Sequence, residues 1–307
     1  MDTNNYLLYT DTLTKTFKNH SAVNCIDIHV KKGAIYGLIG RNGAGKTTLL
    51  KMIAGLSSPT SGEICLYGKS GKELSEIRER VGCHIESPAL YPDMNAYQNL
   101  KCKCIQRNIN NDTYIKDLLK LVGLDDTGKK KAKNFSLGMK QRLGIAMALV
   151  GNPDLLVLDE PINGLDPQGI REIREILIKL NSERGITIII SSHILDELSK
   201  VATDYGIIHN GELVQEITAE SLLEQCKKRI MIRTSNIERT VAVIDKLKIN
   251  NYSVVDNHSI EISGHISESA YINSEIVKAG CEISEIKVQE QSLEEYYFKL
   301  TGGVHNA

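Results

Sequence analysis

The chain has 307 residues, of which 41% are hydrophobic and 24% are charged, and its formal net charge is -1. This length suits one large domain or two smaller ones, and the composition supports a packed core and argues against wholesale disorder. The near-neutral charge disfavours a general nucleic-acid binder, because such proteins are usually basic. No apolar run approaches the roughly 20 residues of a membrane-spanning helix, so we expect no direct insertion into a bilayer.

The cysteines and the opening residues indicate a cytoplasmic protein. The seven cysteines are an odd number without dense spacing, which is typical of reduced thiols in the cytosol. Cys102 and Cys104 lie close together, but without further ligands nearby they are a weak metal signal. The opening MDTNNYLLYT lacks the basic start and long apolar stretch of a secretory signal.

The first part of the chain reads as strands that lead into a glycine-rich loop. The segments YLLYTDTLTKTF (6–17) and VNCIDIHV (23–30) alternate loosely between apolar and polar residues, and AIYGLIG (34–40) predicts a short buried strand. KTTLLKMIAGL (46–56) then has the apolar face of a helix. Strand, glycine loop and helix in this order form the context that a phosphate-binding loop requires.

The loop itself has the pattern GxxxxGK[ST]. Its glycines let backbone N–H groups converge on phosphate oxygens at the N-terminus of a helix. Lys46 can reach the β- and γ-phosphates of a nucleotide, and the Thr47 hydroxyl can ligate Mg²⁺. A chance glycine turn is the alternative, and the flanking strand and helix disfavour it. The nucleotide-binding residues that we expect in this loop are Gly40, Arg41, Asn42, Gly43, Ala44, Gly45, Lys46, Thr47 and Thr48.

Helices and then strands follow. Residues from about 95 to 151 have apolar residues at helical spacing. Strands return at LLVLDEP (155–161) and ITIIISSH (186–193), with the helix GIREIREILIKLNSERG (169–185) between them. YGIIHNGELVQE (205–216) predicts a hairpin that turns at its Asn-Gly pair. The fold class is therefore α/β, with a helical insertion in the core.

Two acids end the first of these returning strands. Asp159 and Glu160 lie at the carboxyl edge of the sheet, where α/β proteins bind ligands. Asp159 would hold Mg²⁺, usually through water, and Glu160 would act as the general base on the attacking water. On its own such a pair is more often solvated, but the upstream phosphate loop favours the functional interpretation.

One long segment carries a family resemblance. NFSLGMKQRLGIAMALVGNPDLLVLDEP (134–161) places a serine–glycine turn at the start of a helix just before the acidic strand, and it resembles the signature segment of ATP-binding cassette (ABC) proteins. NGLD (163–166) resembles their D-loop and SSH (191–193) their switch histidine. Phe17 stands where the family has an aromatic that stacks on adenine, with a core role as the alternative. The resemblance covers about residues 5 to 220.

The resemblance implies an ATPase with a P-loop NTPase fold, made of a RecA-like core, an antiparallel β subdomain and a helical subdomain. It also implies a head-to-tail homodimer that closes on two molecules of ATP with Mg²⁺. Ser136 and Gly138 of one subunit would face the γ-phosphate held by the other, and Asp166 would couple the two sites. His193 would contact the γ-phosphate and help to order the water near Glu160.

Two departures from the family pattern point to a particular subgroup of ABC proteins. The signature reads SLGMKQR (136–142) rather than the commoner SGGQ, and Glu86 in HIESPALYPDMNAYQNL (84–100) stands where the Q-loop normally has a glutamine that senses Mg²⁺ and faces the membrane subunit. Together with QSLEEYYFKLTGG (291–303), both resemble the ATPases of exporters for bacitracin resistance and lantibiotic self-immunity. Glu86 is a further candidate Mg²⁺ ligand, because a carboxylate at this position can still ligate Mg²⁺ or orient water, with a solvated loop acid as the alternative.

The same resemblance implies a separate transmembrane permease as the partner, and a peripheral position on the inner face of the cell membrane. Ala89, Leu90 and Tyr91, beside the Q-loop, are candidates for part of the groove that receives the permease; packing inside the helical insertion is the alternative. The transported substrate is chosen mainly in the permease, so this chain does not define it. Exporters of drugs, lipids or polysaccharides therefore stay open.

After about residue 220 the predicted order β-α-β-β-α-β suggests a small ferredoxin-like domain, with irregular α+β decoration as the alternative. We therefore expect an ABC nucleotide-binding domain at 1–220, with its helical subdomain at about 87–151, and an accessory α+β domain at 221–307.

Three other classes fit less well. ABC proteins of DNA repair carry a long coiled coil between their half-motifs, and no sustained heptads occur here. Translation-associated ABC proteins carry two cassettes, whereas one phosphate loop is present. A phosphotransferase or nucleotide-regulated binding module of the P-loop class would lack the signature segment and His193.

Overall fold

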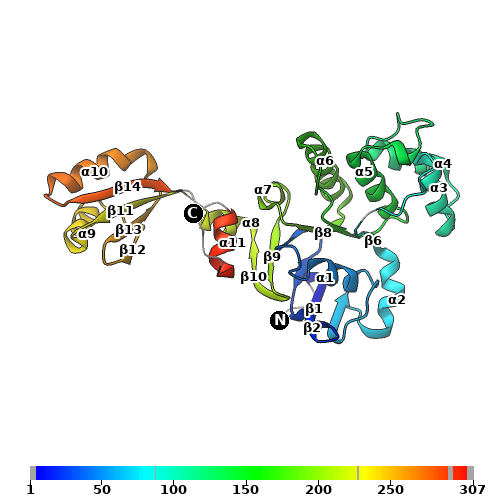
Figure 1. Cartoon of the computed structure of the whole chain (residues 1–307), viewed down its shortest axis with the longest axis horizontal. Coiled ribbons are helices and arrows are strands. Elements are labelled where there is room, and N and C mark those ends of the chain that lie inside the picture. Colours follow the sequence, from blue (N-terminus) through cyan, green and yellow to red (C-terminus); the bar gives the residue numbers. More distant parts are fainter. Residues whose placement is uncertain (1–4, 87, 227, 290–292, 303–307) are drawn as a thin grey trace. The chain divides into compact units, whose positions relative to one another are not determined.

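The computed structural model describes residues 5–86, 88–226, 228–289 and 293–302 (Figure 1). The chain divides into two compact units between Ala219 and Glu220. Predicted segments that extend to residues 1–4, 87, 290–292 or 303 reach there beyond the described residues.

The larger unit is built on a six-stranded sheet with the order β10-β9-β4-β8-β7-β6. Neighbouring strands are parallel except for the hairpin pair β9 and β10. Every residue of β4, β7 and β8 is buried, as expected for central parallel strands that are covered on both faces. The strands of this sheet are β4 (Ile35–Ile39), β6 (Val81–His84), β7 (Leu155–Asp159), β8 (Thr187–Ser192), β9 (Asp204–His209) and β10 (Glu212–Thr218).

An antiparallel sheet forms the second layer, and in it β1 pairs with the other three strands. A shared core joins this sheet to the central one through α1 (Lys46–Ile53), whose Leu49 and Leu50 are fully buried against Leu13 and Val157. The glycine loop at the start of α1 is therefore held between two sheets. The strands are β1 (Tyr6–Phe17), β2 (His20–Ile26), β3 (His29–Lys31) and β5 (Ser61–Leu66).

The helices of the insertion gather beyond β6, as Figure 1 shows for α3, α4 and α5. Side chains cap their first turns: Asn95 and Gln98 form a reciprocal capping box on α3, and Ser136 caps α5. The helices of this unit beyond α1 are α2 (Leu74–Ile77), α3 (Ala96–Gln106), α4 (Asp112–Leu121), α5 (Leu137–Ala148), α6 (Pro167–Arg184) and α7 (Leu195–Leu198), and α8 (Ala219–Gln225) begins at the boundary of the units.

The α/β fold with a helical insertion is confirmed, and so is the predicted hairpin. Asn210 and Gly211 both have positive φ, of 49° and 82°, the backbone that a two-residue type I′ turn needs. No strand is predicted between 57 and 94, where the structure has β5 and β6. The four residues of β6, VGCH, are too few and too mixed for a clear strand pattern.

The smaller unit has the predicted β-α-β-β-α-β order, and its four strands form an antiparallel sheet in the order β12-β13-β11-β14. This is the strand order of a ferredoxin-like fold. Alternate strand residues such as Ile230, Ile232, Ile260 and Ile262 are buried against Ile244 from α9, so one face of the sheet carries the core. The elements are β11 (Arg229–Thr234), α9 (Ile237–Lys246), β12 (Tyr252–Asp256), β13 (Ser259–Ser263), α10 (Ser269–Lys278), β14 (Ile283–Gln289) and α11 (Leu293–Thr301).

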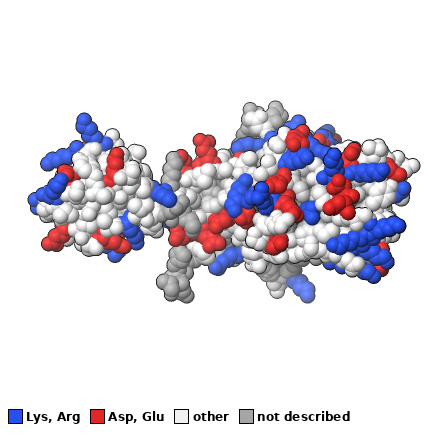
Figure 2. Space-filling view, turned by 90° about the horizontal axis from the view of Figure 1, so that it is seen from above, with Lys and Arg blue, Asp and Glu red and all other residues white. Residues whose placement is uncertain are grey.

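Charged side chains of both signs are mixed on the molecular surface. Figure 2 shows Lys and Arg interspersed with Asp and Glu over the face in view. Several form local ion pairs, such as Lys69 with Glu73 and Arg171 with Glu175. Such exposed pairs contribute little to stability, typically about 0–1 kcal/mol, so the cores described above carry the fold.

We predict that Ile244→Ala destabilises the smaller unit by about 2–5 kcal/mol, because the side chain is fully buried in that unit's own core. Urea unfolding should show a lower midpoint for this unit, while the affinity of the whole chain for ATP stays within about twofold because the phosphate loop lies in the other core. Val277→Ala, at an exposed position of α10, should change stability by less than about 0.5 kcal/mol. Loss of ATP binding in Ile244→Ala would contradict the separation of the cores.

Candidate functional site

The glycine loop connects the buried strand β4 to α1, as predicted. Gly43 and Gly45 have φ of 83° and 106°, which L side chains rarely adopt. A Cβ at Gly45 would lie 2.3 Å from the carbonyl oxygen of Ala22 in β2, so the loop passes close beneath the antiparallel sheet. Arg41 and Asn42 are exposed at the tip of the loop, and Ala44 is buried at its base.

Lys46 lies inside this loop with only 5% of its surface exposed. Its ammonium donates to the carbonyl oxygens of Gly40 at 2.6 Å and Arg41 at 3.3 Å, and lies 3.1 Å from Oε1 of Glu160. The buried charge is therefore satisfied by loop carbonyls and one carboxylate. These are contacts that phosphate oxygens can replace, because they are of the same acceptor type.

The buried carboxylate of Asp159 joins three elements at the end of β7. Its Oδ2 accepts a hydrogen bond from the Thr47 hydroxyl of α1 at 2.7 Å, and its Oδ1 accepts one from the Ser191 hydroxyl of β8 at 2.6 Å. The same Ser191 oxygen accepts from the backbone N–H of Glu160 at 2.9 Å. The oxygens of Thr47 and Asp159 are the hard donors that Mg²⁺ prefers.

The carboxylate of Glu160 lies between the side chains of Lys46 and His193. One carboxylate oxygen lies beside Lys46, and the other is 2.6 Å from Nδ1 of His193. Its backbone has φ of 49°, in the left-handed region, which is sparsely populated by non-glycine residues and often marks functional sites. The structure therefore brings together five of the predicted residues: Lys46, Thr47, Asp159, Glu160 and His193.

The signature and D-loop residues lie elsewhere. Ser136 caps α5 by accepting from the N–H of Met139 at 3.3 Å, and Asp166 caps α6 by accepting from the N–H of Gly169 at 3.0 Å. Among the described residues, no hydrogen bond or ion pair joins these two side chains to Lys46, Asp159 or Glu160. Gly138 is half-buried, and an added Cβ would make ordinary van der Waals contact with Leu165 at 3.8 Å.

Phe17 ends β1 with 52% of its surface exposed, so it does not fill the core. The Nζ of Lys15 lies 5.1 Å from the centre of its ring. An exposed ring face is the requirement for stacking on a base.

Glu86 follows β6 with a positive φ of 63°, and 64% of its side chain is exposed. Its carboxylate forms an ion pair with Lys51 of α1 at 2.5 Å. Among the described contacts, it does not join the hydrogen-bonded group of Thr47 and Asp159, with which it was predicted to share Mg²⁺. Of the apolar candidates beside it, Ala89 is exposed, Leu90 is half-buried and Tyr91 is 46% exposed.

A cavity of about 170 Å³ lies next to this segment, between β6, α3 and α5. Ala89 is among its lining residues, and Lys103 of α3 and Arg107 just after this helix contribute positive charge. This part of the predicted groove is thus apolar at one side and basic at the other.

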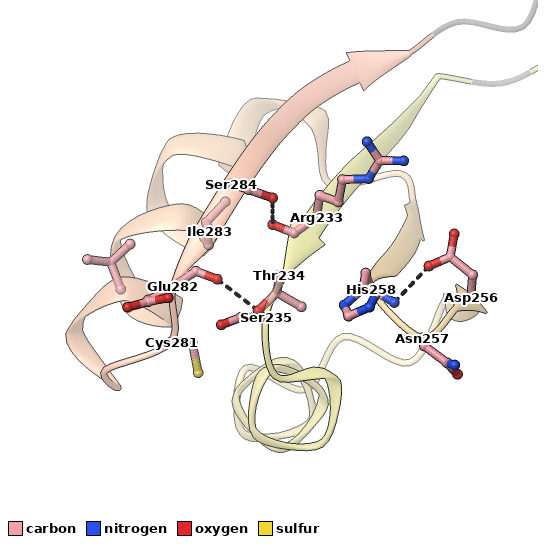
Figure 3. Close-up of a pocket in the computed structure, with 11 residues that line it drawn as sticks. Arg233, Thr234, Ser235, Asp256, Asn257, His258, Cys281, Glu282, Ile283 and Ser284 are labelled. Atoms are coloured by element: carbon pink, nitrogen blue, oxygen red, sulfur yellow. Dashed lines mark hydrogen bonds between the residues drawn. The ribbon is translucent and has the colours of Figure 1, made fainter.

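A second, more open hollow of about 1070 Å³ lies in the smaller unit (Figure 3). Its rim residues bond mainly to one another: Thr234 donates to the Glu282 carbonyl at 2.9 Å, and the His258 N–H donates to Asp256 at 2.7 Å. Figure 3 shows these partners around the mouth of the hollow, with no buried charged group aimed into it among the side chains drawn. We therefore do not assign the active site to it.

Two further features of the larger unit were not predicted. The bridging role of Ser191 was missed, although SSH had been singled out, because a hydroxyl at a strand end gives no sequence signal of its own. His84 at the end of β6 is buried and hydrogen-bonds Gln141 of α5 through Nε2 and Oε1. Burial lowers the pKa of His84 below its ordinary value, and the Gln141 bond and the charge of Asp159 oppose this shift.

The site thus combines a phosphate loop, a buried strand-end aspartate and a glutamate that contacts a lysine and a histidine. These features define a P-loop nucleoside triphosphatase. No helix among the described residues is both long enough and apolar enough to cross a bilayer.

Comparisons with known proteins identify the family. The family model for ABC transporters matches residues 23–163. The bacitracin transport ATP-binding protein BcrA of Bacillus licheniformis is 41% identical over 97% of this chain and 98% of its own length. The lantibiotic transport ATP-binding protein SrtF of Streptococcus pyogenes is 44% identical over 68% of this chain and 90% of its own.

Among solved structures, a dimeric post-hydrolysis state of the ATP-binding cassette MJ0796 bound to ADP and Pi is similar, with a TM-score of 0.63 and 26% identity over 69% of this chain and 98% of that one. The chain belongs to the family of ABC transporter ATP-binding proteins, and it is an ATPase. The resemblance to the bacitracin and lantibiotic group is confirmed.

We predict that Ser191→Ala lowers kcat by about 10- to 100-fold, because loss of a residue that orients a metal-site carboxylate typically has this effect. The Kd for ATP should change by less than about threefold, since the loop around Lys46 stays intact. Ser192→Ala is the matched control, because this neighbouring buried hydroxyl bonds only to the backbone of Ile194 in the described contacts. Steady-state hydrolysis and equilibrium ATP binding would test this, and equal losses in both variants would contradict the role of Ser191.

Proposed function

We propose that this protein is the ATPase subunit of an exporter that removes a peptide antibiotic, of the bacitracin or lantibiotic type, through a separate membrane permease. The observation that carries the ATPase part is Glu160, held between Lys46 and His193 at the end of a buried strand. The substrate class is supported by the relatives BcrA and SrtF, of which the first matches this chain over nearly its full length. Through the permease, the protein lies peripherally on the inner face of the cell membrane.

In the proposed reaction, water attacks the γ-phosphorus of ATP and the bond to the bridging oxygen breaks, which gives ADP and inorganic phosphate. Glu160 takes the proton from the water, and His193 holds the Glu160 carboxylate in position through its Nδ1 contact. Lys46 neutralises phosphate charge inside the loop. Mg²⁺ would be held by Thr47 and Asp159, whose oxygens fit it, and would neutralise further phosphate charge.

The complete site requires two chains in this proposal. Ser136 and Leu137 are exposed and Gly138 is half-buried, so the signature turn is accessible to a second subunit. There it would meet the γ-phosphate bound by the partner, with Asp166 near the interface. Phe17 would stack on adenine through its exposed ring.

The permease would bind at the cavity beside Glu86. The apolar lining around Ala89 suits a short helix of the partner, and Lys103 and Arg107 suit an acidic residue on it. Glu86 would respond to that contact and to Mg²⁺ by exchanging its Lys51 partner, because this exposed ion pair contributes little stability and is easily broken.

We expect Glu160→Gln to bind MgATP but to hydrolyse it at least about 100-fold more slowly, because the general base is removed. The trapped state should double its mass in analytical ultracentrifugation with MgATP, and stay monomeric without nucleotide. Lys46→Ala in the same background should bind ATP poorly and remain a monomer. A Glu160→Gln chain that binds MgATP and stays monomeric would contradict closure without the permease.

Glu86→Gln should leave the Kd for ATP within about twofold and alter the stimulation of ATPase activity by the permease, since it removes a negative charge beside the proposed docking cavity. Glu73→Gln is a matched control, because Glu73 is similarly exposed (60%, against 64% for Glu86) and also pairs with a lysine. ATPase rates in membranes that contain the co-expressed permease provide the measurement. Unchanged stimulation and transport in Glu86→Gln would rule out a coupling role.

A further inference from the structure

Helix α5 and strand β6 approach each other at backbone distance through two glycines. A Cβ at Gly82 of β6 would lie 2.1 Å from the carbonyl oxygen of Ala148 in α5. A Cβ at Gly144 of α5 would lie 2.9 Å from Cε1 of His84 in β6. Neither glycine has a positive φ. Both are therefore explained by close packing and not by the conformation of the backbone.

We call this close contact between α5 and β6 the seam, and the His84 ring fills one end of it. It is only 5% exposed, it rests against Gly144, and its Nε2 hydrogen-bonds Oε1 of Gln141 one turn earlier on the same face of α5. Gln141 is itself 8% exposed. The pair is thus a buried and mutually satisfied polar contact in an otherwise apolar interface, which specifies one register of α5 on β6.

The two ends of this contact lead to different parts of the proposed site. His84 pairs in register with Leu158, the residue before Asp159. Gln141 lies five positions after Ser136, which is about 7 Å along a helix axis. Because α5 is a single continuous helix that begins directly after Ser136, a shift of Gln141 on β6 moves the signature turn by a similar amount.

We propose that His84 is a positioning residue for the signature turn, which holds α5 on β6 so that Ser136 and Gly138 meet the γ-phosphate in the opposing subunit. This inference rests on the proposed dimer. His84 does not touch the nucleotide in this account, and it acts only through α5. It also lines the cavity proposed for the permease, so a partner bound there would contact the residue that sets the position of the signature turn.

We expect a change in the seam to affect one of two binding steps, the closure of two chains, and not the other, the binding of ATP to each chain. The loop around Lys46 is built from β4 and α1 and does not depend on the seam, so ATP should bind each chain normally. Closure of two chains needs the signature turn in place, and a misplacement of about 1 Å can cost on the order of 100-fold at a site of this kind.

The test uses the full chain in the Glu160→Gln background. Gly144→Ala adds a methyl group where the His84 ring lies, and we expect it to raise the dissociation constant of the MgATP-dependent dimer by about 10- to 100-fold. The Kd for ATP should stay within about twofold. His84→Ala combined with Gly144→Ala should recover at least part of the dimer affinity, because the new methyl group then occupies the space left by the ring.

Two further variants keep the test decisive. Gln141→Leu retains the volume and removes the acceptor for His84, so it should weaken closure even if Gly144→Ala does not fold. Ile244→Ala creates a cavity in the separate core of the smaller unit, and serves as a control for loss of thermal stability. Equal loss of dimer affinity in this control, or normal closure in both Gly144→Ala and Gln141→Leu, would overturn the proposal.

The Glu160→Gln chain without further changes distinguishes failure of this proposal from failure of the proposed function. If Glu160→Gln itself does not dimerise, the closed-dimer model fails. Hydrogen exchange of the amides at 137–141 then decides the role of His84. Faster exchange in Gly144→Ala and Gln141→Leu, but not in Ile244→Ala, would support positioning, and unchanged exchange would overturn it.

Discussion

The buried carboxylate of Asp159 is the contact on which the arrangement of the site depends. It accepts hydrogen bonds from Thr47 at the start of α1 and from Ser191 at the end of β8. A buried carboxylate without such partners would cost several kcal/mol in lost hydration. The chain can therefore keep this charge in its core only if the ends of β7 and β8 meet the start of α1, and this requirement brings the phosphate loop and the end of β7 together.

Glu160 depends on this arrangement in turn. Its backbone N–H is held by the Ser191 oxygen that donates to Asp159, so the direction in which the chain leaves β7 is coupled to the buried carboxylate. The left-handed backbone at Glu160 then turns its side chain toward Lys46 and His193. In its proposed role as general base, a carboxylate fixed in this way would need little reorganisation when the reaction begins, and such preorganisation is a main source of catalysis in phosphoryl transfer.

The sequence predicted the parts of the site that follow from strand ends. Asp159 ends β7, His193 follows β8, and the glycine loop that leads to Lys46 follows β4. These buried strands are parallel, and the carboxyl ends of parallel strands meet at one edge of a sheet. Side-chain contacts between elements were not predictable in this way. His84 and Gln141 are 57 positions apart, and neither lies in a sequence pattern that predicts a contact with the other. Glu86 has a lysine partner that depends on how α1 packs against the Q-loop segment. The small unit was predicted in full order because its strands and helices alternate with clear periods.

Within one chain, Ser136 of the signature turn and Asp166 of the D-loop have a local structural role. Ser136 and Asp166 cap the helices that follow them, and this local role alone would account for both residue types. Capping does not explain the exposed Leu137 beside Ser136, since apolar exposure adds nothing to a helix N-terminus. In the proposed dimer, the surface of the second subunit would cover this side chain. The close packing of α5 on β6 has a function in the same proposal, because a turn that must fit a second subunit can be no better placed than the helix that carries it.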